Sequence, residues 1–141
     1  VLDPTEGYAA LFQHLVATVG GHPEQSQLKA YLASTPDLPD WPRQICGFML
    51  GYIDARRLLE IAAASEPNEV DWHTCEADFY ISQVARAAGR NDEELSYLQQ
   101  CIATDELNVA EFWVAKYRLE RLHSPRSSPL GRPRPGGSPS I

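Results

Sequence analysis

Several features that would assign a function directly are missing from this sequence. The 141 residues contain no run of about 18 apolar residues, which a membrane-spanning helix requires. The two Gly-Gly pairs, at 20–21 and 136–137, lack the preceding strand and following helix of a phosphate-binding loop. No charged and then apolar signal segment precedes Asp3, but the chain opens on Val1 rather than Met. The compartment, cytoplasm or periplasm, is therefore left open.

Cysteine is scarce and shows no pairing pattern. The chain has three cysteines, Cys46, Cys75 and Cys101, which is an odd number without paired short spacings. This argues against a secreted module held together by disulfide bonds. Each cysteine lies on or beside a predicted apolar helix face, where a free thiol behaves as a small hydrophobic group. We expect these thiols to be packing residues.

Basic residues are few as well. The chain has 12 Lys and Arg against 19 Asp and Glu, and the part up to Leu122 holds 9 of the basic residues and all of the acidic ones. Such a surface repels phosphates and anionic membranes, so we expect no nucleic-acid binding. With 43% hydrophobic residues, the chain is long enough for one domain with a core.

Helical patterns account for most of the chain. Apolar residues recur at helical spacing in seven segments, and no segment has the pattern of a strand. The predicted helices cover residues 3–19, 24–33, 42–50, 54–64, 71–88, 91–102 and 108–122. Gly51 and Gly89 are each placed just past a helix end, because glycine tolerates left-handed geometry. Asn91 with Glu94 has the spacing of a capping pair, and the same spacing at 108 and 111 opens the last helix.

Two segments carry a resemblance to a known family. Cys75 to Tyr80, followed by Ala87 to Asn91, resembles a tetratricopeptide repeat (TPR) of the bacterial kind. Asn108 to Phe112 with Arg118 to Leu122 is similar to the closing helix of a group of bacterial repeat proteins, which includes an outer-membrane lipoprotein adaptor for cell-wall enzymes. The resemblance covers roughly residues 8–122 and departs from the repeat pattern at positions 82, 85 and 94.

This resemblance implies a fold and a function. The fold would be all-α, a short right-handed superhelical stack of antiparallel helix pairs (a TPR-like solenoid) over residues 1–122. The function would be that of a non-catalytic scaffold or adaptor, which binds a peptide or partner protein in a concave groove. The resemblance points to Glu76, Phe79, Gln83 and Arg86 as the groove-facing residues. The oligomeric state is left open.

Two alternatives to the adaptor stay open. The first is a structural role as the C-terminal part of a longer repeat protein, whose binding site lies upstream. The second is an enzyme that uses His73 or Cys75. Because residues two apart on a helix face different directions, and because no oxyanion donor accompanies them, we expect neither catalysis nor a metal or cofactor site there.

Three further patterns each have a functional interpretation and a purely structural one. The acidic cluster Glu66, Glu69, Asp71, Glu76 and Asp78 is either a docking patch for a basic partner or, more simply, a solvated surface beside a helix N-terminus.

The last predicted helix carries Phe112, Trp113 and Tyr117, which we expect mainly in the core. Residues 123–141, rich in Pro, Ser, Gly and Arg, are expected to be a disordered tail. The Pro129 to Pro133 spacing within it would suit a proline-recognising partner, but a plain flexible tail is the simpler interpretation.

Overall fold

The computed structural model describes residues 25–123, which form six helices and no strand. The helices are α2 (Gln25–Ser34), α3 (Asp40–Met49), α4 (Ala55–Ala63), α5 (Val70–Ala87), α6 (Asn91–Ala103) and α7 (Ala110–His123). The all-α class is thereby confirmed, and six of the seven predicted helices are found. The predicted helix over residues 3–19 and the predicted disordered tail from residue 124 onward lie outside the described residues. No described helix is both long and apolar enough to cross a membrane.

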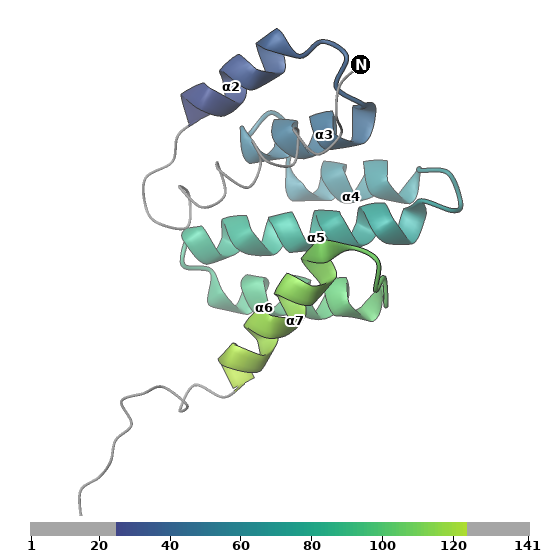
Figure 1. Ribbon diagram of the computed structural model, residues 1–141. Helices are drawn as coiled ribbons and strands as arrows, with labels where there is room; N and C mark the ends of the chain where they lie inside the picture. The colour runs from purple at the N-terminus through teal and green to yellow at the C-terminus, as the bar shows by residue number, and fades with distance from the viewer. Residues whose placement is uncertain (1–24, 124–141) are drawn as a thin grey trace, which may run out of the picture.

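The central element is α5. In Figure 1, α3, α4, α5 and α6 lie one beside the next, and α7 crosses α5 and α6 obliquely. α5 contacts α3, α4, α6 and α7 directly, and its contact with α6 is the most extensive. Among the described helices, α4 and α6 do not contact each other, and α2 contacts only α3. The longest described helix, α5, therefore joins α3, α4, α6 and α7 into one body.

The helix starts follow from local chemistry, with one difference from the prediction. Asp54 caps α4, because its carboxylate accepts a hydrogen bond from the backbone N–H of Arg57 at 2.9 Å. α3 begins at Asp40 rather than at the predicted Pro42. Pro42 is then the third helical residue, where its missing N–H would have no partner within the helix. Pro42 at this position is compatible with a helix α3 that starts at Asp40.

Two helices end in the predicted glycine turns. Gly51 and Gly89 both have positive φ, at 83° and 77°. After α3, the N–H of Tyr52 donates to the carbonyl of Gly47 at 2.8 Å, and after α5 the N–H of Arg90 donates to Ala85 at 2.9 Å. These bonds cover carbonyls that a helix end leaves without partners, so the chain reverses without leaving them exposed.

Two predicted capping acids join separate helices. Glu94 makes no capping bond at the start of α6, and its carboxylate instead receives two hydrogen bonds from Arg118 on α7. Glu111 is also buried, and its carboxylate accepts a hydrogen bond from Tyr80 at 3.0 Å. The capping interpretation is wrong for Glu94, whereas Glu111 bonds a backbone N–H in the first turn of α7 as well as Tyr80 of α5.

The core runs through all six described helices. Its largest fully buried apolar side chains are Leu28, Ile45, Leu58, Phe79, Tyr80 and Leu98. Each apolar side chain of this size stabilises the fold by about 2 kcal/mol on burial. All three cysteines are buried free thiols, as predicted.

Candidate functional site

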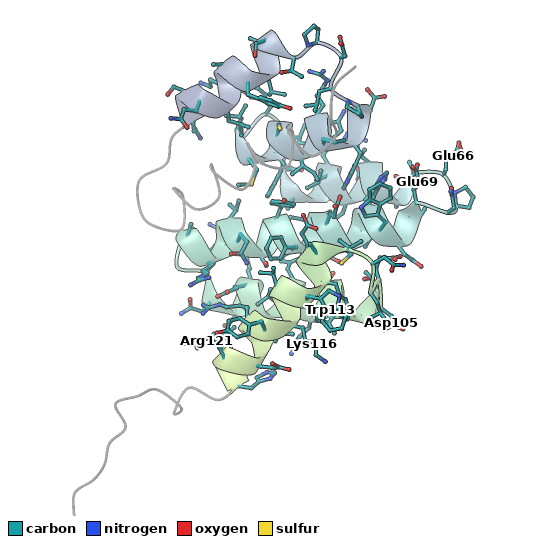
Figure 2. The ribbon with its side chains drawn as sticks, viewed as in Figure 1. Glu66, Glu69, Asp105, Trp113, Lys116 and Arg121 are labelled. Atoms are coloured by element: carbon teal, nitrogen blue, oxygen red, sulfur yellow. The ribbon has the colours of Figure 1, made fainter. Side chains whose placement is uncertain are left out.

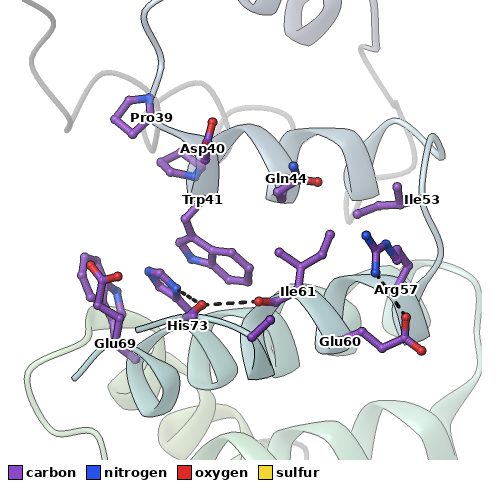
Figure 3. Close-up of a pocket in the computed structure, with 14 residues that line it drawn as sticks. Pro39, Asp40, Trp41, Gln44, Ile53, Arg57, Glu60, Ile61, Glu69 and His73 are labelled. Atoms are coloured by element: carbon purple, nitrogen blue, oxygen red, sulfur yellow. Dashed lines mark hydrogen bonds and ion pairs between the residues drawn. The ribbon is translucent and has the colours of Figure 1, made fainter. Parts of the chain in front are cut away.

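A groove of about 1040 Å³ opens between α3, α4 and the first turn of α5 (Figure 3). We call it the α3–α4–α5 groove. Its apolar lining comes from Trp41, Pro42, Ile53, Ile61 and Trp72, and its charged lining from Asp40, Arg57, Glu60 and Glu69. A groove of this size is within the range of ligand-binding sites and accommodates several side chains of a bound segment.

The segment before α3 positions the groove wall. Three prolines between residues 36 and 42 restrict the backbone, and Pro39 is extended with φ −55° and ψ 156°. The guanidinium of Arg43 donates to the carbonyls of Thr35, Pro36 and Leu38 at 3.0 to 3.1 Å. Because these carbonyls have no helical partners, the arginine stabilises the extended segment and fixes the start of α3.

Trp41 ties α3 to α5 at one side of the groove. Its Nε1 donates to Oε1 of Glu76 at 2.7 Å, and its ring stacks on His73 with centroids 4.4 Å apart and planes 17° apart. Figure 3 shows Trp41 projecting from α3 toward His73. The wall is therefore rigid on the α5 side.

His73 presents a neutral ring to the groove. Burial lowers its pKa from the ordinary value of 6.5, and the nearby charge of Glu69 opposes that shift only in part. Its Nδ1 lies 2.7 Å from Oγ of Ser65, and that Oγ lies 3.4 Å from the carbonyl oxygen of Ile61. The Ser65 hydroxyl can donate to Ile61 while accepting from Nδ1–H, an arrangement that leaves Nε2 with a lone pair.

The groove has more negative than positive charge. Three carboxylates and one guanidinium line it, and Arg57 lies 3.4 Å from Glu60 in an exposed ion pair. Asp40 and Glu69 have no ion pair with any residue in 25–123. Both stand at helix N-termini, where an acid favours the helix dipole. Their charges are also available to a cation that enters the groove.

The four residues that the resemblance assigned to a groove lie elsewhere. Glu76, Phe79 and Gln83 are buried, and Arg86 is half-buried near Glu94 of α6. Glu76 is held by Trp41 as described above, and Gln83 donates to the neighbouring Ser82 hydroxyl at 3.2 Å. Contact of these residues with a partner stays a prediction, and contact with the three buried ones would require α5 to be uncovered first.

The structure also separates His73 from Cys75. His73 lies at the groove beside Ser65, whereas Cys75 is fully buried against Cys101 of α6. The Ser65 Oγ and His73 Nδ1 atoms lie within hydrogen-bond distance, and the ring tautomer sets which of the two donates. Within residues 25–123, no three His, Cys, Asp or Glu side chains gather as metal ligands would.

The predicted acidic cluster is not one surface. Glu66 and Asp71 are exposed and Glu69 is partly exposed, whereas Glu76 and Asp78 are buried. Neither the docking-patch nor the solvated-surface interpretation fits all five acids. Burial raises the pKa of Asp78 to about 7, and its Oδ1 has no hydrogen-bond partner among the described residues. Only the three acids at the start of α5 remain accessible to a partner.

The aromatic residues of α7 are divided between core and surface. Phe112 is buried as expected, but Trp113 and Tyr117 are 51% and 60% exposed, so the core expectation is wrong for these two. Trp113 Nε1 donates to the carbonyl of Leu107 at 2.9 Å, and the Arg121 guanidinium lies 5.7 Å from the Tyr117 ring centre. Figure 2 shows this side of α7, with Trp113, Lys116 and Arg121 labelled.

The amphipathic pattern of α7 placed Phe112 inward, but it did not separate the neighbouring aromatic residues. The Trp41-Pro42 segment is a sequence signal for the groove, whereas the hydrogen bond between Ser65 and His73 has no sequence signal.

Comparisons with protein-family models, curated proteins and solved structures found no match to this chain.

Proposed function

We propose that this chain is a non-catalytic, TPR-like adaptor that binds a basic segment of a partner protein in the α3–α4–α5 groove. The observation that carries the proposal is the composition of the groove, whose apolar walls adjoin two carboxylates without ion-pair partners among the described residues. Apolar lining gives affinity, and a few charged or polar groups give orientation.

The packing of the described helices supports a repeat architecture. α3 and α7 each contact α5, whereas α4 and α6 contact α5 but not each other. Stacked helix pairs produce this pattern, since the first helix of each pair contacts the first helix of the next. We infer that α3–α4 and α5–α6 are two successive pairs of a short right-handed superhelix and that α7 closes it.

The lining residues indicate how a basic segment would be held. A Lys or Arg side chain over the Trp72 ring would gain cation–π attraction, and the Glu69 carboxylate would form a hydrogen-bonded ion pair with it. Trp72 is 37% exposed, so its ring is accessible without rearrangement of the core. Nε2 of His73 would accept a hydrogen bond from a ligand N–H. An apolar neighbour in the ligand would cover Ile53 and Ile61.

Peptide selection tests the proposal without knowledge of the partner. Short random peptides displayed on phage would be selected on the full chain, and binding of the selected peptides would be measured by calorimetry. We expect sequences with a net positive charge and an apolar residue. Glu69→Lys should weaken binding by about tenfold or more, because it places a cation where the ligand cation binds.

Glu66→Lys is the matched control. Glu66 precedes α5 in the same loop as Glu69 and is exposed, but it does not line the groove. Its reversal makes the same change in net charge and should alter affinity by no more than about twofold. If both variants lost the same affinity, the cause would be the change in overall charge. That result would contradict binding in the groove. Selected peptides without positive charge would contradict the basic ligand.

A further inference from the structure

Two of the three thiols meet in the interior, although their sequence spacing shows no pairing. Cys75 on α5 and Cys101 on α6 are both fully buried, and their Sγ atoms lie 3.3 Å apart. They belong to the most extensively packed pair of described helices. A disulfide bond requires an Sγ–Sγ distance of about 2.05 Å, so the two sulfur atoms need to approach by only about 1.3 Å.

We propose that Cys75 and Cys101 are a modification site, at which a small peroxide oxidises the two thiols to a disulfide bond between α5 and α6. The oxidant class follows from the burial of both sulfur atoms. A bulky disulfide reagent has no exposed sulfur to attack, whereas a peroxide molecule is close to water in size. This inference is independent of the proposed function of the groove.

The environment distinguishes the two sulfur atoms. The hydrogen bond with Cys101 lowers the pKa of Cys75, although burial opposes that shift, and the adjacent Thr104 hydroxyl acts in the same direction as the bond. The same bond raises the pKa of Cys101, which burial raises further. Cys75 is therefore the sulfur that ionises first and attacks the oxidant.

The reaction balances with one peroxide molecule. The Cys75 thiolate attacks one oxygen of H–O–O–H, an S–O bond forms, the O–O bond breaks, and the departing hydroxide becomes water with the proton that Cys75 released. The Cys101 sulfur then attacks the resulting sulfenic acid. The S–S bond forms, the S–O bond breaks, and hydroxide leaves with the Cys101 proton as a second water. Two electrons pass from the sulfur pair to the peroxide.

Cys46 provides an internal control. It is buried in α3 and forms no sulfur contact with the other two cysteines. Burial raises its pKa to about 11, so it remains a thiol at neutral pH. The proposal predicts that peroxide spares Cys46, even though its exposure matches that of the reacting pair.

The test treats the folded full chain with hydrogen peroxide, removes the oxidant, and alkylates in denaturant. Intact mass should show the loss of two hydrogen atoms and alkylation of Cys46 alone, and peptide mapping should find Cys75 joined to Cys101. The melting temperature should rise by roughly 10 °C and return to its starting value with dithiothreitol, because the cross-link restricts the unfolded chain.

Two variants sharpen the result. Cys46→Ala should keep both the cross-link and the thermal shift. Cys101→Ala should lose both, because Cys75 then has no partner sulfur and loses the hydrogen bond that lowers its pKa. Three alkylated thiols in the treated wild-type chain would overturn the proposal, as would a cross-link that includes Cys46 or over-oxidised cysteines without a cross-link. The wild-type measurement needs no variant, so it stands even if a substitution prevents folding.

Discussion

The two halves of the described chain are built differently. In the C-terminal half (α5, α6 and α7), buried polar contacts join the helices: Tyr80 to Glu111 between α5 and α7, and Arg118 to Glu94 between α7 and α6. In the N-terminal half (α2, α3 and α4), contacts between helices are sparser, and a groove opens between α3, α4 and the start of α5. Stability is therefore concentrated in one half, and space for a ligand lies beside the other.

This division has a physical reason. A buried polar group is tolerated only with a partner in the right place, so each buried pair fixes the relative position of two helices. In the N-terminal half, the buried hydrogen bond from Trp41 to Glu76 attaches α3 to α5 rather than to α4. Substitutions in the C-terminal half should therefore affect global stability most, and those at the groove should act locally.

The largest effect is expected for Phe79→Ala. Phe79 is 1% exposed and contacts Tyr80 edge to face, so truncation leaves a cavity in the C-terminal half. The free energy of unfolding should fall by about 4 kcal/mol, measured by urea denaturation. Tyr52→Ala, at a 64% exposed site, is the control and should change it by less than about 0.5 kcal/mol. A loss below about 1 kcal/mol for Phe79→Ala would contradict its place in the core.

A second prediction concerns pH. Burial raises the pKa of Asp78 to about 7 from 3.8, so the folded chain keeps a proton that the unfolded chain releases. The stability from this proton is fully present below the unfolded pKa and is lost as pH rises toward 7. Relative to Asp78→Asn, the wild-type chain should lose about 3 kcal/mol between pH 4 and pH 7 in urea titrations. Parallel curves for the two proteins would contradict a buried, protonated Asp78.

His73, in the first turn of α5 beside the groove, should have the opposite pH dependence. Burial lowers its pKa, so as pH falls below 6.5 the unfolded chain binds a proton at this residue before the folded chain does, and stability is lost. The pKa of Glu111 is raised mainly by burial, and this adds to the effect of Asp78 in the C-terminal half. The wild-type and Asp78→Asn chains share the contributions of His73 and Glu111. The difference in stability between the two chains therefore reports on Asp78 alone.

The buried ion pair gives a smaller effect. Arg118→Ala leaves the Glu94 carboxylate, which is 1% exposed, without its bidentate partner. We expect a loss of about 2 kcal/mol in urea denaturation, at the low end for buried pairs because the arginine is partly exposed. Arg90→Ala breaks an exposed pair with Glu93 and should cost less than about 0.5 kcal/mol. Equal losses in the free energy of unfolding for Arg118→Ala and Arg90→Ala would show that burial of Glu94 does not strengthen its ion pair.

The smallest effect belongs to the groove. Ser65→Ala removes the hydrogen bond to His73 and should lower stability by about 1 kcal/mol. Amide exchange should increase mainly at the start of α5, with α6 and α7 unchanged. Ser96→Ala, at an exposed site on α6, is the control and should have no measurable effect. Faster exchange throughout α6 and α7 would show that the halves are not separate in stability.

The candidate site was less predictable than the helices. The resemblance placed a binding groove at α5, whereas Glu76, Phe79 and Gln83 on that helix are buried. The approach of Cys75 to Cys101 was not foreseen either, because 26 residues separate them and no spacing pattern connects them.

The amino-acid sequence was sufficient for the all-α class, the positions of the six described helices and the glycine turns at Gly51 and Gly89. These depend on interactions within about one helical turn, which a local pattern records. The partners of Glu94, Glu111 and the Cys75 thiol were decided by the tertiary structure. Their partners lie 24 to 31 residues away along the chain, and only the packing of α5, α6 and α7 brings them within bonding distance.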